Sequence, residues 1–264
     1  MTTTERIQLL GGNVQGQAPH TGATNAIDRL GIPAVYFTDG SVGIRQGSAT
    51  QMPTPTGLAA AFDPAMARQH GVVIAAEAKD KGNDVVYGPT VNIARNPQGG
   101  RSYESYGEEP FLVARTAVGW IDGAQSTGVI ADVKHFAGNN QEGQDGAPPF
   151  TGLAGSRLLV NAQIDERTLR ELYFPHFEAA VKQANVGTLM CSYNMVNGIY
   201  SCQNPHDTQQ VLERDWGFKG IVLSDYGAAH DTGPSLTNGL DFEPSSQFGT
   251  TQAYTRSRST QHWP

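Results

Sequence analysis

Short apolar runs alternate with amphipathic stretches along most of this chain. Runs of Val, Ile and Leu without polar alternation suit strands buried on both faces, whereas apolar residues three and four apart suit one helix face. Capping residues mark helix starts, as at Asp63-Pro64 and Asp165. The pattern predicts strands at 32–37, 84–87, 128–136, 186–193 and 220–225, an irregular extension at 91–93, and helices starting near residues 4, 63, 110, 165 and 208.

Repeated strand-then-helix units predict a parallel sheet, and 264 residues favour a (β/α)8 TIM-type barrel of the α/β class over an open sheet. Five strands are clear, and residues 239–243 are a candidate sixth. Residues 245–264 are rich in Ser, Thr and Gln and lack the apolar periodicity of closing helices. We therefore expect a barrel domain over 1–244 that is incomplete at its C-terminal end, an irregular or disordered tail at 245–264, and a truncated chain.

Ionisable side chains stand where two of the expected strands end. Asp225 follows the run 220–224, and Lys134 and His135 lie near the end of the run 128–136. The carboxyl ends of the strands carry the active site in α/β barrels. An Asp in this position also caps the next helix in many proteins, so Asp225 alone is weak evidence. Two strand ends that bring Asp, Lys and His to one rim together predict a site for a polar ligand.

Composition narrows the classes of partner. The net charge is −7 and no cluster of Lys or Arg occurs, which argues against nucleic acid. No apolar stretch approaches the roughly 20 residues that cross a bilayer, so no membrane partner is expected. Seven scattered His and two Cys form no zinc pattern, and neither a phosphate-binding loop nor a Gly-x-Ser-x-Gly motif is present. We expect no metal and no cofactor.

Seven segments between residues 5 and 243 carry a family resemblance. They are 29–33 with 38–40, then 88–93, 99–110, 134–136, 165–171, 190–194 and 223–226. In this order they resemble glycoside hydrolase family 3, the β-glucosidase-type enzymes. The resemblance implies an N-terminal barrel whose strand ends follow the same order. It also implies a retaining β-glycosidase that acts on terminal non-reducing β-D-glucosyl residues, so the expected partner is a β-linked oligosaccharide or glucoside.

The resemblance assigns roles to individual residues. Asp225 matches the family's nucleophile, which attacks the anomeric carbon and forms a covalent glycosyl-enzyme. Asp39 is expected to accept hydrogen bonds from sugar hydroxyls and Lys134 and His135 to donate them, while nearby cations keep Asp225 ionised. The residues that match the pocket for the non-reducing sugar are Asp39, Arg101, Lys134, His135 and Tyr193.

Departures from the family pattern bear on the substrate more than on the reaction. Asp145 stands where members usually have an Arg after the Gln-Glu pair, and Tyr226 stands where many have Trp. A simpler, structural role stays open for two pocket residues. Arg101 and Glu104 can simply pair with each other, and Tyr193 can simply pack in the core. A β-xylosidase is the alternative within the family.

The motifs do not contain a general acid. N-acetylglucosaminidase members use a His soon after the Lys-His-Phe motif, but no His occurs between His135 and His176, so this subgroup is not expected. β-Glucosidase and β-xylosidase members use a Glu of a second, C-terminal domain, and we expect the acid/base there, outside this chain. Two alternatives from other classes stay open: a catalytically inert sugar-binding fragment, and a Schiff-base lyase with Lys134 as nucleophile.

The two cysteines bear on the compartment. Cys191 and Cys202 flank Asn197-Gly198, which predicts a tight turn that brings them together, so either a disulfide or two buried thiols is compatible with the sequence. The family and this pair suggest secretion or a periplasmic location. Residues 1–6 lack the basic and apolar regions of a signal peptide, so the localisation stays unknown, as does the oligomeric state.

Overall fold

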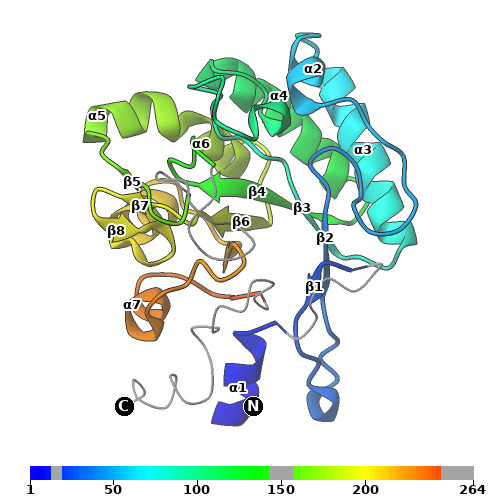
Figure 1. The fold of residues 1–264 in the computed structure, drawn as a ribbon. Helices are drawn as coiled ribbons and strands as arrows, with labels where there is room; N and C mark the ends of the chain where they lie inside the picture. Colours follow the sequence, from blue (N-terminus) through cyan, green and yellow to red (C-terminus); the bar gives the residue numbers. More distant parts are fainter. Residues whose placement is uncertain (13–19, 143–156, 245–264) are drawn as a thin grey trace.

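A curled six-stranded sheet lies at the centre of the computed structural model, which describes residues 1–12, 20–142 and 157–244 (Figure 1). The strand order is β1-β2-β3-β4-β6-β9, and all neighbours are parallel except β1, which is antiparallel to β2. The strands are β1 (Gly22–Ala23), β2 (Tyr36–Asp39), β3 (Val85–Tyr87), β4 (Ile130–Phe136), β6 (Thr188–Cys191) and β9 (Ile221–Ser224).

Three α-helices cover the outer face of this sheet. α3 (Pro64–Asp80) packs along α4 (Pro110–Gln125), and α6 (Pro175–Lys182) packs on α4 and β4 (Figure 1). The other helical segments are α1 (Thr3–Leu9), η1 (Asp28–Leu30), α2 (Pro55–Ala59), η2 (Ser102–Glu104), α5 (Glu166–Thr168), the π-helical η3 (Leu169–Tyr173), η4 (Ser201–Gln203), the π-helical η5 (His206–Asp215) and α7 (Thr232–Thr237). In the described part of the chain, no helix combines the length and apolarity of a membrane span.

The two predicted capping residues, Asp63 and Asp165, are confirmed, but one predicted helix is interrupted. The Asp63 carboxylate accepts from the backbone N–H of Ala65, and the Asp165 carboxylate accepts from that of Thr168. The long helix expected after Asp165 is divided into α5, η3 and α6. Pro175 stands at the first position of α6, where its missing N–H costs no hydrogen bond, whereas inside a continuous helix it would remove one.

Apolar side chains form two clusters on opposite faces of the sheet. The larger cluster lies between the sheet and helices α3, α4 and α6, and its largest fully buried members include Trp120, Phe136 and Phe177. The smaller cluster fills the concave face and consists of Phe37, Val85, Tyr87, Met190, Leu223, Tyr226 and Phe242. Burial on both faces explains why the strands appear in the sequence as apolar runs without alternation.

The named strands form half of a barrel. Isolated backbone bridges link its two edges, pairing Leu223 with Phe242, Gly11 with Glu243, and Gly12 with Thr24. The expected α/β class and parallel strands are confirmed. A regular (β/α)8 barrel is not what the structure shows, since β1 is antiparallel and single residue pairs stand where the last strands of a barrel would be. The candidate strand at 239–243 is likewise reduced to isolated bridges.

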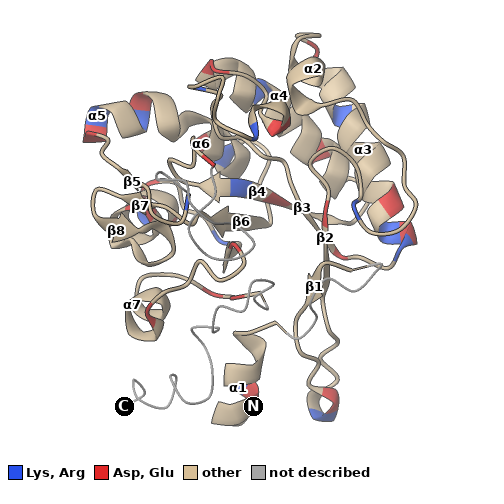
Figure 2. Ribbon diagram, viewed as in Figure 1, with Lys and Arg blue, Asp and Glu red and all other residues tan. Residues whose placement is uncertain are grey.

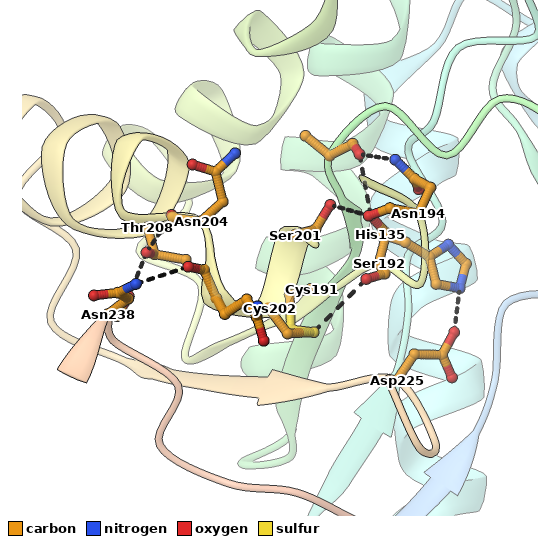
Figure 3. Close-up of a disulfide and its surroundings, with 12 residues drawn as sticks. His135, Cys191, Ser192, Asn194, Ser201, Cys202, Asn204, Thr208, Asp225 and Asn238 are labelled. Carbon is orange, nitrogen blue, oxygen red and sulfur yellow. Dashed lines mark hydrogen bonds and ion pairs between the residues drawn. A yellow bond between two sulfur atoms is a disulfide. The ribbon is translucent and has the colours of Figure 1, made fainter. Parts of the chain in front are cut away.

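A small second sheet positions the disulfide. It has the order β5-β7-β8, with β5 at Asn161–Ala162, β7 at Met195–Val196 and β8 at Ile199–Tyr200. Asn197 and Gly198 have φ values of 50° and 90°, so the predicted tight turn is confirmed. The hairpin returns the chain to β6, and Cys202 forms a disulfide with Cys191 at a Cα–Cα distance of 5.1 Å (Figure 3).

We predict that replacing both cysteines, as Cys191→Ser/Cys202→Ser, lowers the free energy of unfolding by about 2–3 kcal/mol, because the unfolded chain regains the freedom of a short closed loop. The bridge spans a sequence separation of 11. Guanidinium unfolding under non-reducing conditions measures the difference. Wild-type protein unfolded with a reductant present is the matched control and should give the variant's value. Equal stability of variant and oxidised wild type would contradict the prediction.

Candidate active site

The carboxyl ends of β2, β4, β6 and β9 meet at one edge of the sheet and surround a cavity of about 290 Å³. Register places Asp39 of β2 beside Tyr87 of β3, and Lys134 of β4 beside Met190 of β6. The Asp225 N–H donates to Cys191 O at 3.1 Å directly after β9. All the residues that the sequence predicted for a site line this cavity: Asp225, Asp39, Arg101, Lys134, His135 and Tyr193.

Lys134 lies deep in the cavity and faces an acid. Its side chain is 6% exposed, and its Nζ is 3.7 Å from Asp39 Oδ1. Thr21 Oγ1 donates to the other oxygen of Asp39 at 3.3 Å. Strand β4 carries one acidic and one basic residue, and Figure 2 shows a red and a blue segment on this strand.

Arg101 pairs with Glu104, which the sequence left open as its simpler role, and it also lines the cavity. Its Nε and Nη2 donate to the two oxygens of Glu104 at 2.9 and 2.8 Å. Burial alone would raise the pKa of Glu104, but the paired guanidinium outweighs burial and holds this pKa at about 2. Arg101 Nη1 is left for the cavity, where it lies 3.2 Å from His135 Nε2.

His135 is neutral, with its proton on Nδ1. Asn92 fixes this tautomer: its amide nitrogen donates to His135 O at 2.8 Å, so its oxygen accepts from His135 N at 2.9 Å and from Nδ1 at 3.0 Å. Burial, and then the charges of Arg101 and Lys134, lower the pKa of His135 well below its ordinary value. Nε2 is therefore an acceptor, to which Arg101 Nη1 can donate, and this tautomer favours acceptance over the donation to a sugar that the sequence led us to expect.

Asp225 faces this neutral imidazole. Its Oδ2 lies 3.6 Å from His135 Nε2, and Figure 3 shows the two side chains pointing toward one another close to the disulfide. Its Oδ1 accepts from the backbone N–H of Tyr226 at 2.8 Å, and the side chain is 12% exposed. Because Nε2 carries no proton, the contact joins two acceptors and is not an ion pair.

Two tyrosines support this strand end. Tyr193 is buried and lines the cavity, and its hydroxyl, which lies near Asp225, donates to Tyr226 O at 2.7 Å. The Tyr226 hydroxyl in turn donates to Thr21 O at 3.0 Å. Tyr226 therefore links the end of β9 to the segment that enters β1. The link is made by its hydroxyl group, which a Trp lacks.

Comparison with known proteins identifies the family. A model of the glycosyl hydrolase family 3 N-terminal domain matches residues 10–237. The chain belongs to glycosyl hydrolase family 3. A β-glucosidase of Rhizobium radiobacter is 40% identical over 250 residues, which are 92% of this chain and 28% of that protein. An exo-α-(1→6)-L-arabinopyranosidase of Bifidobacterium breve is 40% identical over 257 residues, which are 92% of this chain and 32% of that protein.

A solved family 3 enzyme shares this fold. The structure of a β-glucosidase from Streptomyces venezuelae in complex with D-glucose has a TM-score of 0.88 and 37% identity, and the match covers 98% of this chain and 33% of that one. The chain spans about a third of the length of the curated relatives it matches. Membership of family 3 favours a glycosidase over the Schiff-base lyase considered from the sequence.

The sequence did not assign every cavity residue to the site, and two that it left out, Glu142 and Arg157, form an ion pair there. Glu142 Oε1 lies 3.5 Å from Arg101 Nη1, and its Oε2 lies 3.1 Å from Arg157 Nη1. Gly100 makes room for Glu142: its φ is 95°, and a Cβ there would meet the Glu142 Cβ at 2.8 Å. Arg157 follows a long Gly- and Pro-rich segment, and no local pattern marks it as a site residue. Asp145 lies outside the described residues.

Asp132 lies beneath the cavity and is fully buried. It is two residues before Lys134 on β4, so both side chains point into the curled sheet. Neither carboxyl oxygen has a hydrogen-bond partner among the described residues, although Thr188 is close enough to influence the group and itself donates to Ala131 O at 3.2 Å. Burial raises the pKa of Asp132 to about 8, against the charge of Lys134, so the group is protonated at neutral pH. Within the described chain, no cluster of three acids, His or Cys could hold a metal.

We predict that Asp132→Asn makes stability less dependent on pH. The folded state keeps this proton up to about pH 8, whereas an unfolded Asp releases it near its ordinary value of 3.8. The stabilisation is therefore complete below the unfolded pKa and is lost as pH rises through the folded one. Between about pH 5 and pH 8 wild type should lose on the order of a few kcal/mol more than the variant.

Thermal melts across this pH range measure the effect. Asp122→Asn, at an exposed position on α4, is the matched control and should follow the wild-type curve. Parallel curves for Asp132→Asn and wild type would show that Asp132 does not hold its proton in the folded state.

Proposed function

We propose that the cavity binds the terminal non-reducing sugar of a β-linked glucoside or oligosaccharide, in a retaining hydrolase of the β-glucosidase type. The observation that carries the proposal is the position of Asp225 in the same cavity as the Lys134–Asp39 pair and the neutral His135. Donors and acceptors alternate around this cavity, which suits a ring whose hydroxyls both donate and accept. The relatives named β-glucosidase support the same substrate class.

Asp225 is the proposed nucleophile. The Tyr226 N–H holds Oδ1 at 2.8 Å and leaves Oδ2 toward the cavity. In the first step an Asp225 oxygen bonds to the anomeric carbon while the bond to the aglycone oxygen breaks, and a proton goes to that leaving oxygen. In the second step water attacks the same carbon and gives one proton to the group that served as the acid, the ester bond breaks, and the Asp225 carboxylate is restored.

The proposed sugar contacts follow from the charge and tautomer of each group. Asp39 accepts from sugar hydroxyls, and Lys134 and Arg101 donate to hydroxyl oxygens. His135 can only accept, through Nε2, because Asn92 occupies its N–H, and a ligand would share this atom with Arg101 Nη1, which lies 3.2 Å away. Tyr193 offers its ring, since its hydroxyl is engaged with the backbone. A ligand hydroxyl placed between Asp225 and His135 would meet two acceptors and would orient its hydrogen toward one of them.

The general acid is proposed to come from outside residues 1–244, which we take as the N-terminal domain of the enzyme. The two other acids that line the cavity beside Asp39 and Asp225 are committed elsewhere. Arg101 holds Glu104 through both oxygens, and Glu142 accepts from Arg101, Arg157 and Asn139. No described residue therefore suits proton donation to the leaving group. A Glu on a C-terminal domain, as the family resemblance implies, would complete the site.

Two further substrates are candidates because a relative of equal identity is named an exo-α-(1→6)-L-arabinopyranosidase. L-Arabinopyranose and D-xylopyranose lack the hydroxymethyl group of glucose. In a β-xylosidase or an arabinopyranosidase, the cavity would therefore not have to hold that group. Titration of the protein with the three free sugars ranks them by affinity. Binding without turnover on any glycoside would instead identify a catalytically inert sugar-binding fragment.

We predict that a 2-deoxy-2-fluoro-β-D-glucoside with a dinitrophenolate leaving group labels Asp225, because the fluorine slows breakdown of the glycosyl-enzyme and this leaving group needs no proton. Peptide mass spectrometry should place the adduct within residues 220–230. Asp225→Asn is the control and should take up no label. An adduct on any other peptide would refute the assignment of the nucleophile.

We predict that this chain alone hydrolyses cellobiose poorly compared with dinitrophenyl β-D-glucoside. General acid catalysis is typically worth about 10²–10⁴-fold, and a sugar alkoxide depends on it far more than a dinitrophenolate does. The ratio of kcat/KM for the two substrates, on monodisperse protein of 264 residues, measures this dependence. Comparable efficiency on both would mean that a general acid lies within the chain.

A further inference from the structure

Asp132 is a buried acid that the proposed reaction does not use. We propose that Asp132 is a positioning residue: its protonated form leaves Lys134 in place for a sugar, and its ionised form draws Lys134 away from the cavity. The affinity of the site for a sugar therefore falls as pH rises. This inference rests on the proposed function, because it concerns the regulation of the same site.

The position of Lys134 allows it to respond to a charge beneath it. Asp132 and Lys134 are two residues apart on β4, so both side chains point into the curled sheet. Lys134 Nζ lies 3.7 Å from Asp39 Oδ1 and 5.8 Å from the centre of the Tyr87 ring. No hydrogen bond of this ammonium lies within the described part of the chain, so the charges around it decide where it rests.

The surroundings of Asp132 favour the neutral acid. Register pairs Asp132 with Thr188 of β6, and Tyr87 of β3 comes next to it on the other side, because Val86 pairs with Ala131. Neither carboxyl oxygen has a hydrogen-bond partner among the described residues. A carboxylate in this position would be charged, out of water and without a donor, which is costly.

The charged groups around Asp132 act in opposite directions. Lys134 on the same strand favours the carboxylate, whereas Asp39 of β2 and Asp225 after β9 disfavour it. Burial is the largest effect and raises the pKa of Asp132 to about 8, although Lys134 and then Thr188 act against it. The proton is therefore lost just above neutral pH.

Other ionisable groups near the cavity titrate outside this range. Burial lowers the pKa of His135 well below its ordinary value, so the imidazole is already neutral at pH 7. Burial also raises the pKa of the Tyr87 and Tyr193 hydroxyls well above the ordinary value for tyrosine. A change in sugar affinity near pH 8 can therefore be traced to Asp132 by replacing that one residue.

Loss of the proton changes which acid Lys134 faces. While Asp132 is neutral, the Asp39 carboxylate attracts the ammonium and keeps it beside the cavity. Once Asp132 is ionised, a second carboxylate attracts the ammonium from below, and a bound hydroxyl loses its donor. The coupling is reciprocal, so a sugar that holds Lys134 must raise the pKa of Asp132. Binding above neutral pH therefore takes up a proton.

Calorimetry with D-glucose on the full 264-residue chain tests this coupling. A coupling of about tenfold, within the usual range for two linked sites, corresponds to a rise of about one unit in the pKa of Asp132 on binding. The Kd should then be constant below about pH 7 and about fivefold higher at about pH 9. Buffers of different ionisation enthalpy should show an uptake of about half a proton per glucose near pH 8.5, and almost none near pH 6.

Three variants assign the proton to its residue. Asp132→Asn cannot titrate, so its glucose affinity should not fall near pH 8 and its binding should take up no proton. Asp132→Ala should do the same, and it decides the matter if Asp132→Asn does not fold, as judged by circular dichroism. Asp122→Asn, at an exposed position on α4, is the matched control and should keep the wild-type pH profile and proton uptake.

The outcomes separate the two proposals. If wild type binds glucose with one Kd from about pH 6 to about pH 9 and takes up no proton, the role of Asp132 is refuted while the sugar site stands. Proton uptake that persists in Asp132→Asn would also refute it, because another group would then be titrating. If wild type binds none of the pyranoses at any pH, the proposed function fails, and the assignment of Asp132 fails with it.

Discussion

The acidic side chains that are partly buried at the carboxyl edge of the sheet depend on the cationic side chains placed between them. An unpaired carboxylate in a partly buried site costs several kcal/mol, so each needs a partner of opposite charge or a set of donors. Three pairs meet this need: Lys134 with Asp39, Arg101 with Glu104, and Arg157 with Glu142. Asp225 stands outside these pairs and faces a neutral imidazole. Among the four acids that line the cavity, the one without a cationic partner is thus the one that the family pattern identifies as the nucleophile.

The sheet that holds these pairs is built from contacts between distant parts of the chain. Cys191 O accepts from the Asp225 N–H, so β6 places the start of the turn after β9. The Tyr226 hydroxyl reaches Thr21 O, which joins the last named strand to the residue before β1. Single bridges beyond β9 continue this connection back to β1. The site therefore depends on closure of the sheet around it, even though part of that closure is made by isolated residue pairs.

The sequence predicted the features that depend on local chemistry. The helix caps at Asp63 and Asp165 and the Asn197-Gly198 turn each follow from a few adjacent residues, and all three are found. The features it did not predict depend on long-range partners. The tautomer of His135 is set by Asn92, 43 residues earlier, so its role as an acceptor has no local signal. Arg157 reaches the cavity only through Glu142 and the Tyr193 ring, and the antiparallel β1 is two residues long.

The protonation state of Asp132, which lies beneath the cavity, determines which charges surround Lys134. Asp132 and Asp39 both act on Lys134, one from below and one from the side. While Asp132 keeps its proton, Asp39 is the charged acid that faces the Lys134 ammonium, and the cavity keeps its order of donors and acceptors. Loss of that proton would add a second carboxylate below Lys134 and draw the ammonium away from Asp39. The burial that makes Asp132 costly is therefore also what leaves Lys134 to the proposed sugar site.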